Sequence, residues 1–429
     1  MRKIVSFALR QPKINAYLRR LYSEVRSAAD AVTHPATAVP EATPIDTRRS
    51  DQEFSRLTLL VPALSVQHVF GGIATALQVF TAIGESYTNL RIVLTDEAGF
   101  THDKNPAFSG WSIKELDDDD AEGKVIVPAG DRWSKTLPIC AGDVFVTTSW
   151  WTTSIAARIQ AEQQTMFLLP KPQKYIYLIQ DYEPGFYPWS ARYALAEATY
   201  HKAENFLAIF NTSILKDFFQ SEGYEFPLAT HFEPTLHPQL KIRLPSDPSA
   251  KRQKKIIIYG RPGVERNAFP IIVMALKNWI AEAKPEGWTI VSAGEAHPPV
   301  DLGGGYTLTS LGKLSIEGYA AELSSAFIGV SLMISPHPSY PPLEMSAFGV
   351  QVITNKYKSK DLAQFSPDIS TVDFVSPESV ASLLGDLAQA YDLPSTPRSL
   401  AGDYPELTTY TDSDQDFRWL RAWVDENRL

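Results

Sequence analysis

The chain has 429 residues, of which 44% are hydrophobic and 11% are aromatic, as in folded globular proteins. This length suits two domains of about 150–200 residues each. A net charge of −9 argues against general nucleic-acid binding, because that binding depends on neutralising phosphates. The single cysteine, Cys140, excludes an intramolecular disulfide, and no apolar run approaches the ~20 residues of a membrane-spanning helix. We therefore expect a cytoplasmic protein.

The first 33 residues differ in charge from the rest of the chain. They hold seven basic and two acidic side chains, a net charge of +5, which leaves −14 for the remainder. Apolar residues recur at helical spacing over residues 3–32. This helix either packs on the body or lies on anionic lipid at the inner face of the cytoplasmic membrane. The segment AVTHPATAVPEATPIDTRRSDQ then indicates a linker, so residues 1–50 are predicted to form a basic helical arm and linker.

Strands and helices alternate from residue 56 onward. Continuous apolar runs predict strands that are buried on both faces, as in a parallel sheet covered by helices. In the first half these strands are RLTLLVPAL, NLRIVLTDE, KVIVP, DVFVTTS, KYIYLIQD and NFLAIFNT, with a glycine-led helix, FGGIATALQVFTAIG, after the first of them. A connector rich in proline and charge follows at residues 231–253.

The alternation then restarts. The second half predicts the strands KKIIIYG, GWTIVSAGE, IGVSLMIS and VQVITN, with helices between them and a late helix, SPESVASLLGDLAQAYD. We predict an α/β fold with two Rossmann-like, doubly wound domains facing a central cleft, over residues 51–240 and 241–412. Residues 413–429 are predicted to form a helix that docks back on the first domain.

Two strand-to-helix junctions of the second half carry positive charge. Arg261 and Arg266 follow KKIIIYG, and Asn267 can cap the next helix. In SLGKLS, Lys313 stands beside Gly312, where the backbone can approach a ligand closely. Guanidinium and ammonium groups suit an anionic ligand such as a phosphate, although each of these side chains is also compatible with an ordinary solvated surface.

The third junction is the proline-rich stretch SPHPSYPPLEMSAFGVQVITN. A helix is predicted to begin near Pro342, and the free N–H groups of its first turn can bind an anion. Glu344 is predicted in that first turn, where it either complements the helix dipole or accepts hydrogen bonds from ribose or sugar hydroxyls. Together, the three junctions describe a diphosphate site that needs no metal.

These motifs resemble a known family. The chain resembles the retaining GT-B glycosyltransferases of family GT4 in three motifs, YGRPGVERNAF, SLGKLS and SPHPSYPPLEMSAFGVQVITNKYKSKDL. More narrowly, it resembles the WsaF-like group, the rhamnosyltransferases of bacterial cell-surface and S-layer glycan assembly. FGGIATAL and IQDYEPGFYP match as well, so the resemblance covers about residues 56–425. It implies transfer of L-rhamnose from dTDP-rhamnose to a hydroxyl of a growing, lipid-linked cell-surface glycan, without a metal or other cofactor.

The resemblance also implies roles for individual residues. The catalytic residues would be Asp181, Arg261 and Lys313. The donor would be bound by Gly71, Gly72, Arg261, Arg266, Leu311, Gly312, Lys313, His337, Ser339, Tyr340, Pro341 and Glu344, with the backbone near Leu311 on the base and Glu344 on the ribose. The acceptor would be bound by Asp181, Tyr182, Glu183 and Tyr187. The rings of Phe186, Tyr187 and Trp189 either stack on sugars or belong to the core.

The chain departs from the wider family at one position. Many members carry two glutamates separated by seven residues; Glu344 matches the second, but Pro336 stands at the first. His337, Ser339 or backbone groups would then take over the contacts with the sugar. A 6-deoxy sugar lacks the 6-hydroxyl and needs fewer polar partners there, which is consistent with rhamnose.

No metal site is predicted. The acidic run DDDDAE at residues 117–122 is interpreted as a solvated loop, and the eight histidines show no zinc-binding spacing. Alternative functions are transfer from another nucleotide sugar, nucleotide-sugar 2-epimerisation, and binding of glycans or nucleotides without catalysis.

Overall fold

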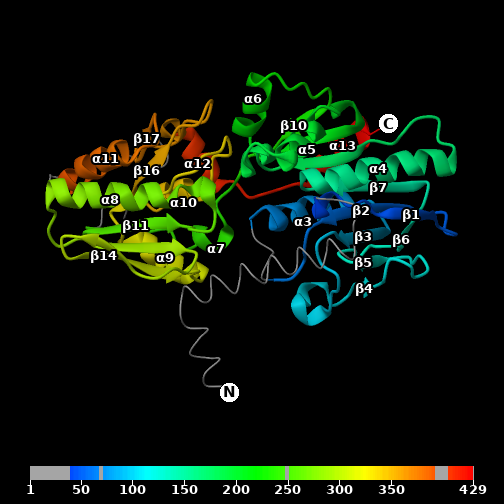
Figure 1. Cartoon of the computed structure of the whole chain (residues 1–429), viewed down its shortest axis with the longest axis horizontal. Coiled ribbons are helices and arrows are strands. Elements are labelled where there is room, and N and C mark those ends of the chain that lie inside the picture. Colours follow the sequence, from blue (N-terminus) through cyan, green and yellow to red (C-terminus); the bar gives the residue numbers. More distant parts are fainter. Residues whose placement is uncertain (1–38, 67–70, 247–250, 392–403, 429) are drawn as a thin grey trace, which may run out of the picture. The chain divides into compact units, whose positions relative to one another are not determined.

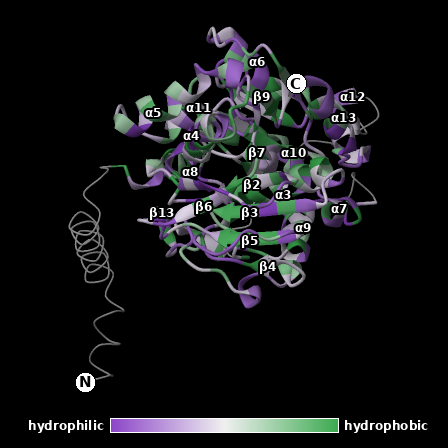
Figure 2. Cartoon of the chain, turned by 90° about the vertical axis from the view of Figure 1, so that its right-hand side faces the viewer, coloured by the Kyte–Doolittle hydropathy of each residue, from purple (hydrophilic) through white to green (hydrophobic). Residues whose placement is uncertain are grey.

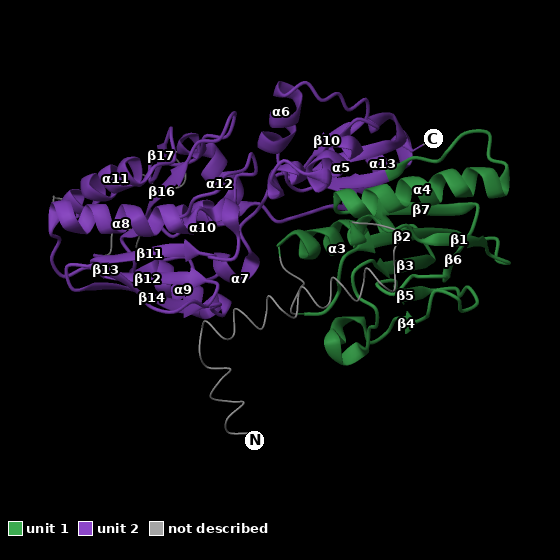
Figure 3. Ribbon diagram, in the orientation of Figure 1, with its two compact units in different colours: residues 1–175 green, residues 176–429 purple. Residues whose placement is uncertain are grey.

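The computed structural model describes residues 39–66, 71–246, 251–391 and 404–428 (Figure 1). The predicted basic helix over residues 3–32 lies outside the described residues. The chain divides into two compact units, residues 1–175 and residues 176–429 (Figure 3). Among the described residues, none of the helices has the length and apolar character needed to cross a bilayer.

Unit 1 contains a parallel sheet with the strand order β7-β2-β3-β5-β4. Its strands are β2 (Ser55–Val61), β3 (Asn89–Leu94), β4 (Ser112–Ile113), β5 (Lys124–Pro128) and β7 (Gly142–Thr147). Its helices are α3 (Gly71–Gly84) and α4 (Trp150–Phe167), with the short 3-10 turns η1 (Pro40–Ala42), η2 (His102–Lys104) and η3 (Pro106–Phe108). All six residues of β3 are buried, including the polar Asn89 and Arg91. The strands of this sheet also carry many hydrophobic residues, which are drawn green in Figure 2.

Part of the predicted linker is a strand. β1 (Asp46–Arg49) pairs in parallel with β6 (Thr136–Ile139), and Ile45 before it is fully buried. The prediction was wrong here because the proline-rich composition hid a short segment whose backbone pairs with a distant strand.

The acidic run at residues 117–122 is also more than a solvated loop. Asp120 lies 2.5 Å from the guanidinium of Arg56, which is buried and donates two further hydrogen bonds to Asp143. Arg91 reaches the same Asp143 carboxylate at 3.1 Å. The interpretation of the run as solvated is therefore wrong for Asp120, which completes a buried ionic network.

Unit 2 begins within β8 and contains two groups of strands. The first group has the order β10-β9-β8, with β8 (Tyr175–Ile179), β9 (Phe206–Phe210) and β10 (Ala229–His231). The second is a seven-stranded sheet of order β13-β14-β12-β11-β15-β16-β17, in which only the β13–β14 pair is antiparallel. Its strands are β11 (Lys255–Gly260), β12 (Thr289–Gly294), β13 (Val300–Gly303), β14 (Tyr306–Gly312), β15 (Ile328–Val330), β16 (Gln351–Asn355) and β17 (Ile369–Val372).

The strand order of the seven-stranded sheet determines where a ligand can bind. Starting from β11, successive strands run outward through β12 to β14, and the chain then crosses to β15 on the other side of β11. This is the doubly wound Rossmann order, whose ligands bind beyond the carboxyl ends of the strands near the point where the order reverses. That point lies between β11 and β15.

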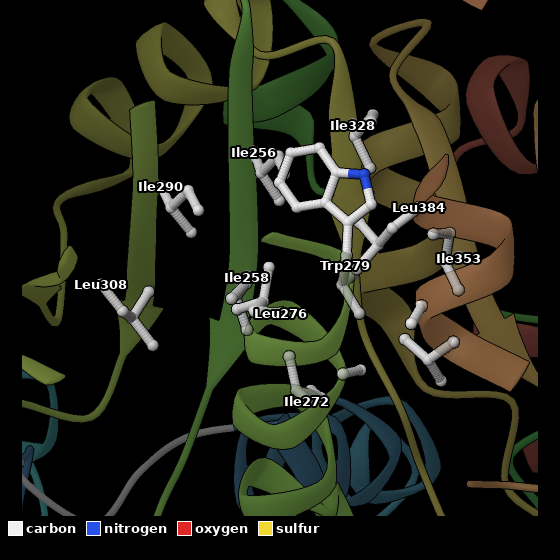
Figure 4. Close-up of a cluster of buried hydrophobic side chains, with 14 of the residues drawn as sticks. Ile256, Ile258, Ile272, Leu276, Trp279, Ile290, Leu308, Ile328, Ile353 and Leu384 are labelled. Carbon is white, nitrogen blue, oxygen red and sulfur yellow. The ribbon is translucent and has the colours of Figure 1, made fainter. Parts of the chain in front are cut away.

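Unit 2 also contains several helices and short 3-10 turns. They are α5 (Ala191–Tyr200), α6 (Ser213–Ser221), α7 (Pro238–Lys241), α8 (Phe269–Ala283), α9 (Ile316–Ser325), α10 (Tyr340–Ala347), α11 (Pro377–Ala390), α12 (Pro405–Asp412) and α13 (Arg418–Asn427), with the turns η4 (Glu183–Phe186), η5 (Ala203–Asn205), η6 (Glu265–Asn267) and η7 (Leu362–Gln364). Trp279 of α8 lies beside Ile256 of β11 and Leu384 of α11, and Leu276 of α8 lies beside Ile258 of β11; all belong to one core (Figure 4).

Two features of this sheet differ from the prediction. β14 has only one buried residue, Leu308, so it lacks the continuous apolar run by which strands were identified. β15 ends at Val330 rather than Ser335, because the backbone of Met333 bonds to the side chains of Asn355 and Lys360 instead of to a neighbouring strand.

The unit boundary differs from the predicted division at residue 240. Residues 176–246 belong to unit 2 because Ile214, Leu236 and Leu240 share a second core with Ile257 of β11 and Leu343 of α10. At the carboxyl end of the chain, Phe417 before α13 packs edge-on against Phe232 with 4.8 Å between the ring centroids.

Candidate functional site

The loop after β11 is held by a carboxylate that sequence reasoning missed. Arg261 follows Gly260 directly and is half-buried. Glu295, at the end of β12, donates its N–H to the Gly260 carbonyl at 2.8 Å and accepts the Gly263 N–H at 2.8 Å. The loop that carries Arg261 is thus fixed at the carboxyl edge of the sheet. The only signal in the sequence was a charged residue directly after an apolar strand.

Arg266 and Asn267 have different surroundings from those predicted. Asn267 does not cap α8: the capping position is Ala268, with φ of 50°, and the Asn267 amide donates to the Leu332 carbonyl at 3.2 Å. Asn267 therefore ties the β11 loop to the segment after β15. The guanidinium of Arg266 lies 3.7 Å from the Asp181 carboxylate and 4.3 Å from the centre of the Phe186 ring.

Lys313 lies at the same edge as Arg261. It is exposed and follows Gly312, the last residue of β14, whose φ of 63° turns the chain. Leu311 beside it is half-buried. One strand, β12, separates β14 from β11, so the two basic residues follow strands about 10 Å apart. That spacing lets two long side chains converge on one diphosphate.

The segment after β15, which we call the elbow (residues 331–339), is anchored at Met333. Asn355 accepts the Met333 N–H at 2.7 Å and donates to the Met333 carbonyl at 3.0 Å. The Nζ of Lys360 donates to the same carbonyl at 2.7 Å. Lys360 is fully buried, and burial lowers the pKa of its ammonium to about 7. Neither Lys360 nor Asn355 was predicted as a site residue.

Beyond this anchor, the elbow contacts Asp181. The hydroxyl of Ser335 donates to the Asp181 carboxylate and accepts the N–H of His337 at 3.1 Å. The Tyr182 N–H donates to the same carboxylate oxygen of Asp181 at 2.8 Å. With Arg266 near its other oxygen and an exposed fraction of 8%, Asp181 is held in one orientation. This geometry suits orienting a hydroxyl.

His337 is neutral in this arrangement. Its Nδ1 accepts the Ser339 N–H at 3.0 Å, and its Nε2 lies 3.1 Å from the side-chain amide of Asn211. Burial lowers the pKa of the imidazole to about 4. Asn211 follows β9 and, like Ser335, was missed because its partner is more than 100 residues away in the sequence.

Glu344 lies one turn later in α10 than predicted. The helix begins at Tyr340 rather than near Pro342, which places Glu344 in the second turn. The capping residue, Ser339, has φ of 67° and makes no side-chain cap bond, and Pro341 is buried at the start of the helix. Burial raises the pKa of Glu344 to about 7, and the nearby Tyr319 hydroxyl partly offsets this shift.

The residues predicted to bind an acceptor separate into two groups. Glu183 is buried, with its carboxylate 3.5 Å from the Tyr177 hydroxyl, and therefore faces the core. Tyr182 is half-buried, and its hydroxyl lies 3.2 Å from that of Tyr224. Tyr187 is half-buried, whereas Trp189 is 89% exposed and does not belong to the core.

The two predicted donor-contacting glycines lie in unit 1. Gly71 and Gly72 are exposed, and α3 begins at Gly71 as the glycine-led pattern predicts. Among the described residues, no atom lies within 4 Å of a methyl group added at Gly71. In the part of the chain that the structure describes, no group of three or more histidine, cysteine, aspartate or glutamate side chains could hold a metal ion.

Comparison with known proteins gives both similar sequences and similar folds. The chain is 36% identical over 185 residues to the O-antigen biosynthesis protein RfbC of Myxococcus xanthus, a match that covers 42% of this chain and 14% of the relative's length. The N-terminal domain of Candida albicans trehalose-6-phosphate phosphatase has a similar structure, with a TM-score of 0.54, 11% identity and coverage of 86% of this chain and 98% of that chain. WaaG, a glycosyltransferase involved in lipopolysaccharide biosynthesis, gives a TM-score of 0.49 at 12% identity, with 86% and 99% covered.

The predicted fold class, GT-B with Rossmann-like sheets, is confirmed by the strand orders and the structural similarity. Two family models match the sequence, the WsaF N-terminal domain over residues 56–213 and the WsaF C-terminal domain over residues 254–385. Because these two models together match more than half of the residues, the chain belongs to the WsaF family.

Proposed function

We propose that this protein is a retaining glycosyltransferase that moves L-rhamnose from dTDP-rhamnose to a hydroxyl of a growing, lipid-linked cell-surface glycan without a metal ion. Membership of the WsaF family supports the glycosyltransferase class. The similarity to a protein named for O-antigen biosynthesis supports a glycan as the product. The observation that carries the proposal is the position of Arg261 and Lys313, which follow β11 and β14 at the ligand-binding edge of a Rossmann sheet.

In this proposal the basic residues act on the leaving group. The bond between the anomeric carbon and the phosphate oxygen breaks, and negative charge accumulates on the departing dTDP. Arg261 and Lys313 stabilise that charge at a place where a metal would otherwise be needed. Glu344 of α10 accepts hydrogen bonds from the ribose, whereas the first turn of this helix offers few N–H groups to a phosphate because Pro341 and Pro342 carry none.

The acceptor oxygen forms its bond on the face that the phosphate leaves, so the anomeric configuration is retained. The proton of the acceptor hydroxyl passes to the departing diphosphate. Asp181, already fixed by Ser335 and by the Tyr182 N–H, orients the acceptor hydroxyl rather than serving as an obligate base. The neutral His337 adds no charge beside the sugar.

The choice of rhamnose is supported by the composition of the elbow. Pro336 is buried and offers no polar side-chain group where the wider family has a glutamate. The side chain of Ile334, two residues earlier, is 37% exposed and apolar. A sugar with a methyl group in place of a 6-hydroxyl loses no hydrogen bond in such surroundings.

Calorimetric titration tests the donor site. We would titrate dTDP-rhamnose, dTDP-glucose, UDP-glucose and GDP-mannose, without added metal, into the wild type, Lys313→Ala and the control Lys277→Ala, which changes an exposed lysine on α8. We expect dTDP-rhamnose to bind tightest and Lys313→Ala to weaken it about tenfold or more, as for loss of a charge-assisted contact. Equal binding by the two lysine variants would contradict the donor site, and tighter binding of UDP-glucose or GDP-mannose would contradict the choice of sugar.

Turnover tests the reaction itself. The product formed from dTDP-rhamnose and a glycan acceptor in the presence of a chelator should keep the anomeric configuration of the donor, as read by NMR. Epimerised nucleotide sugar formed without any acceptor would instead identify a 2-epimerase. Donor binding without any product would identify a binding protein.

A further inference from the structure

An aromatic surface next to Asp181 is not explained by donor binding. We call it the aromatic ridge and define it as Trp189 and Tyr193, whose rings pack together, and Phe186, which lies three residues before Trp189 in the chain. Trp189 is 89% exposed and Phe186 is 38% exposed, although both are large hydrophobic side chains. Exposed aromatic side chains that gather on one surface often mark a place where a partner binds.

The ridge has a fixed geometry. The rings of Trp189 and Tyr193 lie with their centroids 5.0 Å apart at an interplanar angle of 33°. Ser190, at the capping position of α5, accepts the N–H of Tyr193 at 3.3 Å and so fixes the start of the helix that carries this ring. Because Tyr193 supports only one side of the indole, the exposed remainder of Trp189 forms a flat apolar surface.

The ridge is connected to Asp181 by two sets of contacts. The Tyr193 hydroxyl lies 3.5 Å from that of Tyr182, whose N–H donates to Asp181 at 2.8 Å. On the other route, Arg266 lies 4.3 Å from the Phe186 ring centre and 3.7 Å from the Asp181 carboxylate. The ridge therefore continues the surface at which the proposed reaction takes place.

We infer that the aromatic ridge binds the sugar units of the acceptor glycan that precede the reacting hydroxyl, an inference that rests on the proposed glycosyltransferase function. The C–H groups on one face of a pyranose carry partial positive charge and pack against the negative face of an aromatic ring. The hydroxyl of Tyr193 and the guanidinium of Arg266 supply polar groups beside the rings, as binding sites for amphipathic ligands require.

Local charge favours a glycan over an anionic bilayer as the occupant. Residues 181–224 hold six acidic and three basic side chains, a net charge of −3. Anionic lipid attracts segments rich in lysine and arginine and would be repelled here. A neutral saccharide carries no such penalty.

Binding of a rhamnan tetrasaccharide tests the ridge independently of turnover. We would measure its dissociation constant, and that of dTDP, for the wild type, Trp189→Ala and the control Trp419→Ala, which removes a 41% exposed tryptophan from α13. We expect Trp189→Ala to weaken the tetrasaccharide at least tenfold, to change methyl rhamnoside by less than threefold and to leave dTDP within twofold. The control should match the wild type for all three ligands.

The outcomes separate this inference from the proposed function. If Trp189→Ala binds the tetrasaccharide as tightly as the wild type does, or if the wild type does not bind it, the ridge assignment is overturned. If binding depends on Trp189 but the wild type transfers no sugar, the ridge stands and the enzymatic proposal falls. Loss of binding to phosphatidylglycerol vesicles in Trp189→Ala, with unchanged tetrasaccharide binding, would show a membrane contact instead and would also overturn the inference.

Discussion

Replacing Lys360 with methionine should change how the stability of the protein depends on pH. The lysine is fully buried, and its Nζ donates one hydrogen bond, to the Met333 carbonyl at 2.7 Å. Burial lowers the pKa of the ammonium from 10.5 to about 7, and attraction to Asp181 offsets only part of the shift. Methionine fills a similar volume but cannot carry the charge.

The direction of the effect follows from proton binding. Between pH 7 and pH 10.5 the unfolded chain keeps the Lys360 proton while the folded chain has lost it, so the free energy of unfolding rises with pH. The contribution of Lys360 to the free energy of unfolding is fully present above the pKa of the unfolded chain and is lost as the pH falls through the pKa of the folded chain. Each pKa unit corresponds to about 1.4 kcal/mol, so the change from pH 7 to pH 9 has an upper limit of about 3 kcal/mol.

Urea unfolding at pH 7, 8 and 9 measures this difference. We expect the wild type to gain about 2 kcal/mol relative to Lys360→Met over that range, because other titrating groups act equally on both proteins. Lys358→Met is the matched control: its lysine is exposed and lies 3.3 Å from Glu222. If the stabilities of the wild type and Lys360→Met change in parallel with pH, the amine of Lys360 is not desolvated and the reasoning is refuted.

Two further predictions concern stability. Asp143→Ala leaves the buried guanidinium groups of Arg56 and Arg91 without their shared carboxylate and should lower the free energy of unfolding in urea by about 3–5 kcal/mol. The control Asp131→Ala removes an exposed carboxylate and should change that free energy little. Equal effects of the two substitutions would contradict the buried network. Gly260→Ala places a methyl group 1.9 Å from the Ser292 hydroxyl oxygen and should lower the free energy of unfolding by about 1–3 kcal/mol. Adding Ser292→Ala removes that oxygen and should restore part of the lost stability. A double variant no more stable than Gly260→Ala would contradict the clash.

Much of the fold could be predicted because buried parallel strands leave a local signal. KKIIIYG and NLRIVLTDE contain apolar runs at residues 256–258 and 92–94, and β11 and β3 include these runs. β14 has a single fully buried residue, Leu308, and β1 lies in a proline-rich segment. These strands form through pairing with distant neighbours, which a local pattern does not encode.

The candidate site also contains some residues that the sequence indicated and others that only the fold brings together. Arg261 was predicted as a site residue because it directly follows an apolar strand, and Lys313 because it stands beside a glycine in SLGKLS. Both follow strands at the carboxyl edge of the sheet, and their roles stay predictions. The contacts of Ser335 with Asp181 and of His337 with Asn211 join residues more than 100 positions apart. Lys360 has the sequence appearance of a surface lysine, and only the fold shows that it is buried.

The elbow combines a proline-rich sequence with contacts to residues that are distant in the sequence. It is rich in proline, and Asn355 and Lys360 anchor it by their hydrogen bonds to the backbone of Met333. The polar groups that follow, Ser335 and His337, are neutral and are directed at Asp181 and Asn211. A glutamate at the position of Pro336 would add a negative charge directly after Ser335, whose hydroxyl contacts the Asp181 carboxylate. With proline there, we expect specificity for the sugar to depend on shape and on the exposed side chain of Ile334, and affinity for the nucleotide to depend on the basic residues that follow β11 and β14.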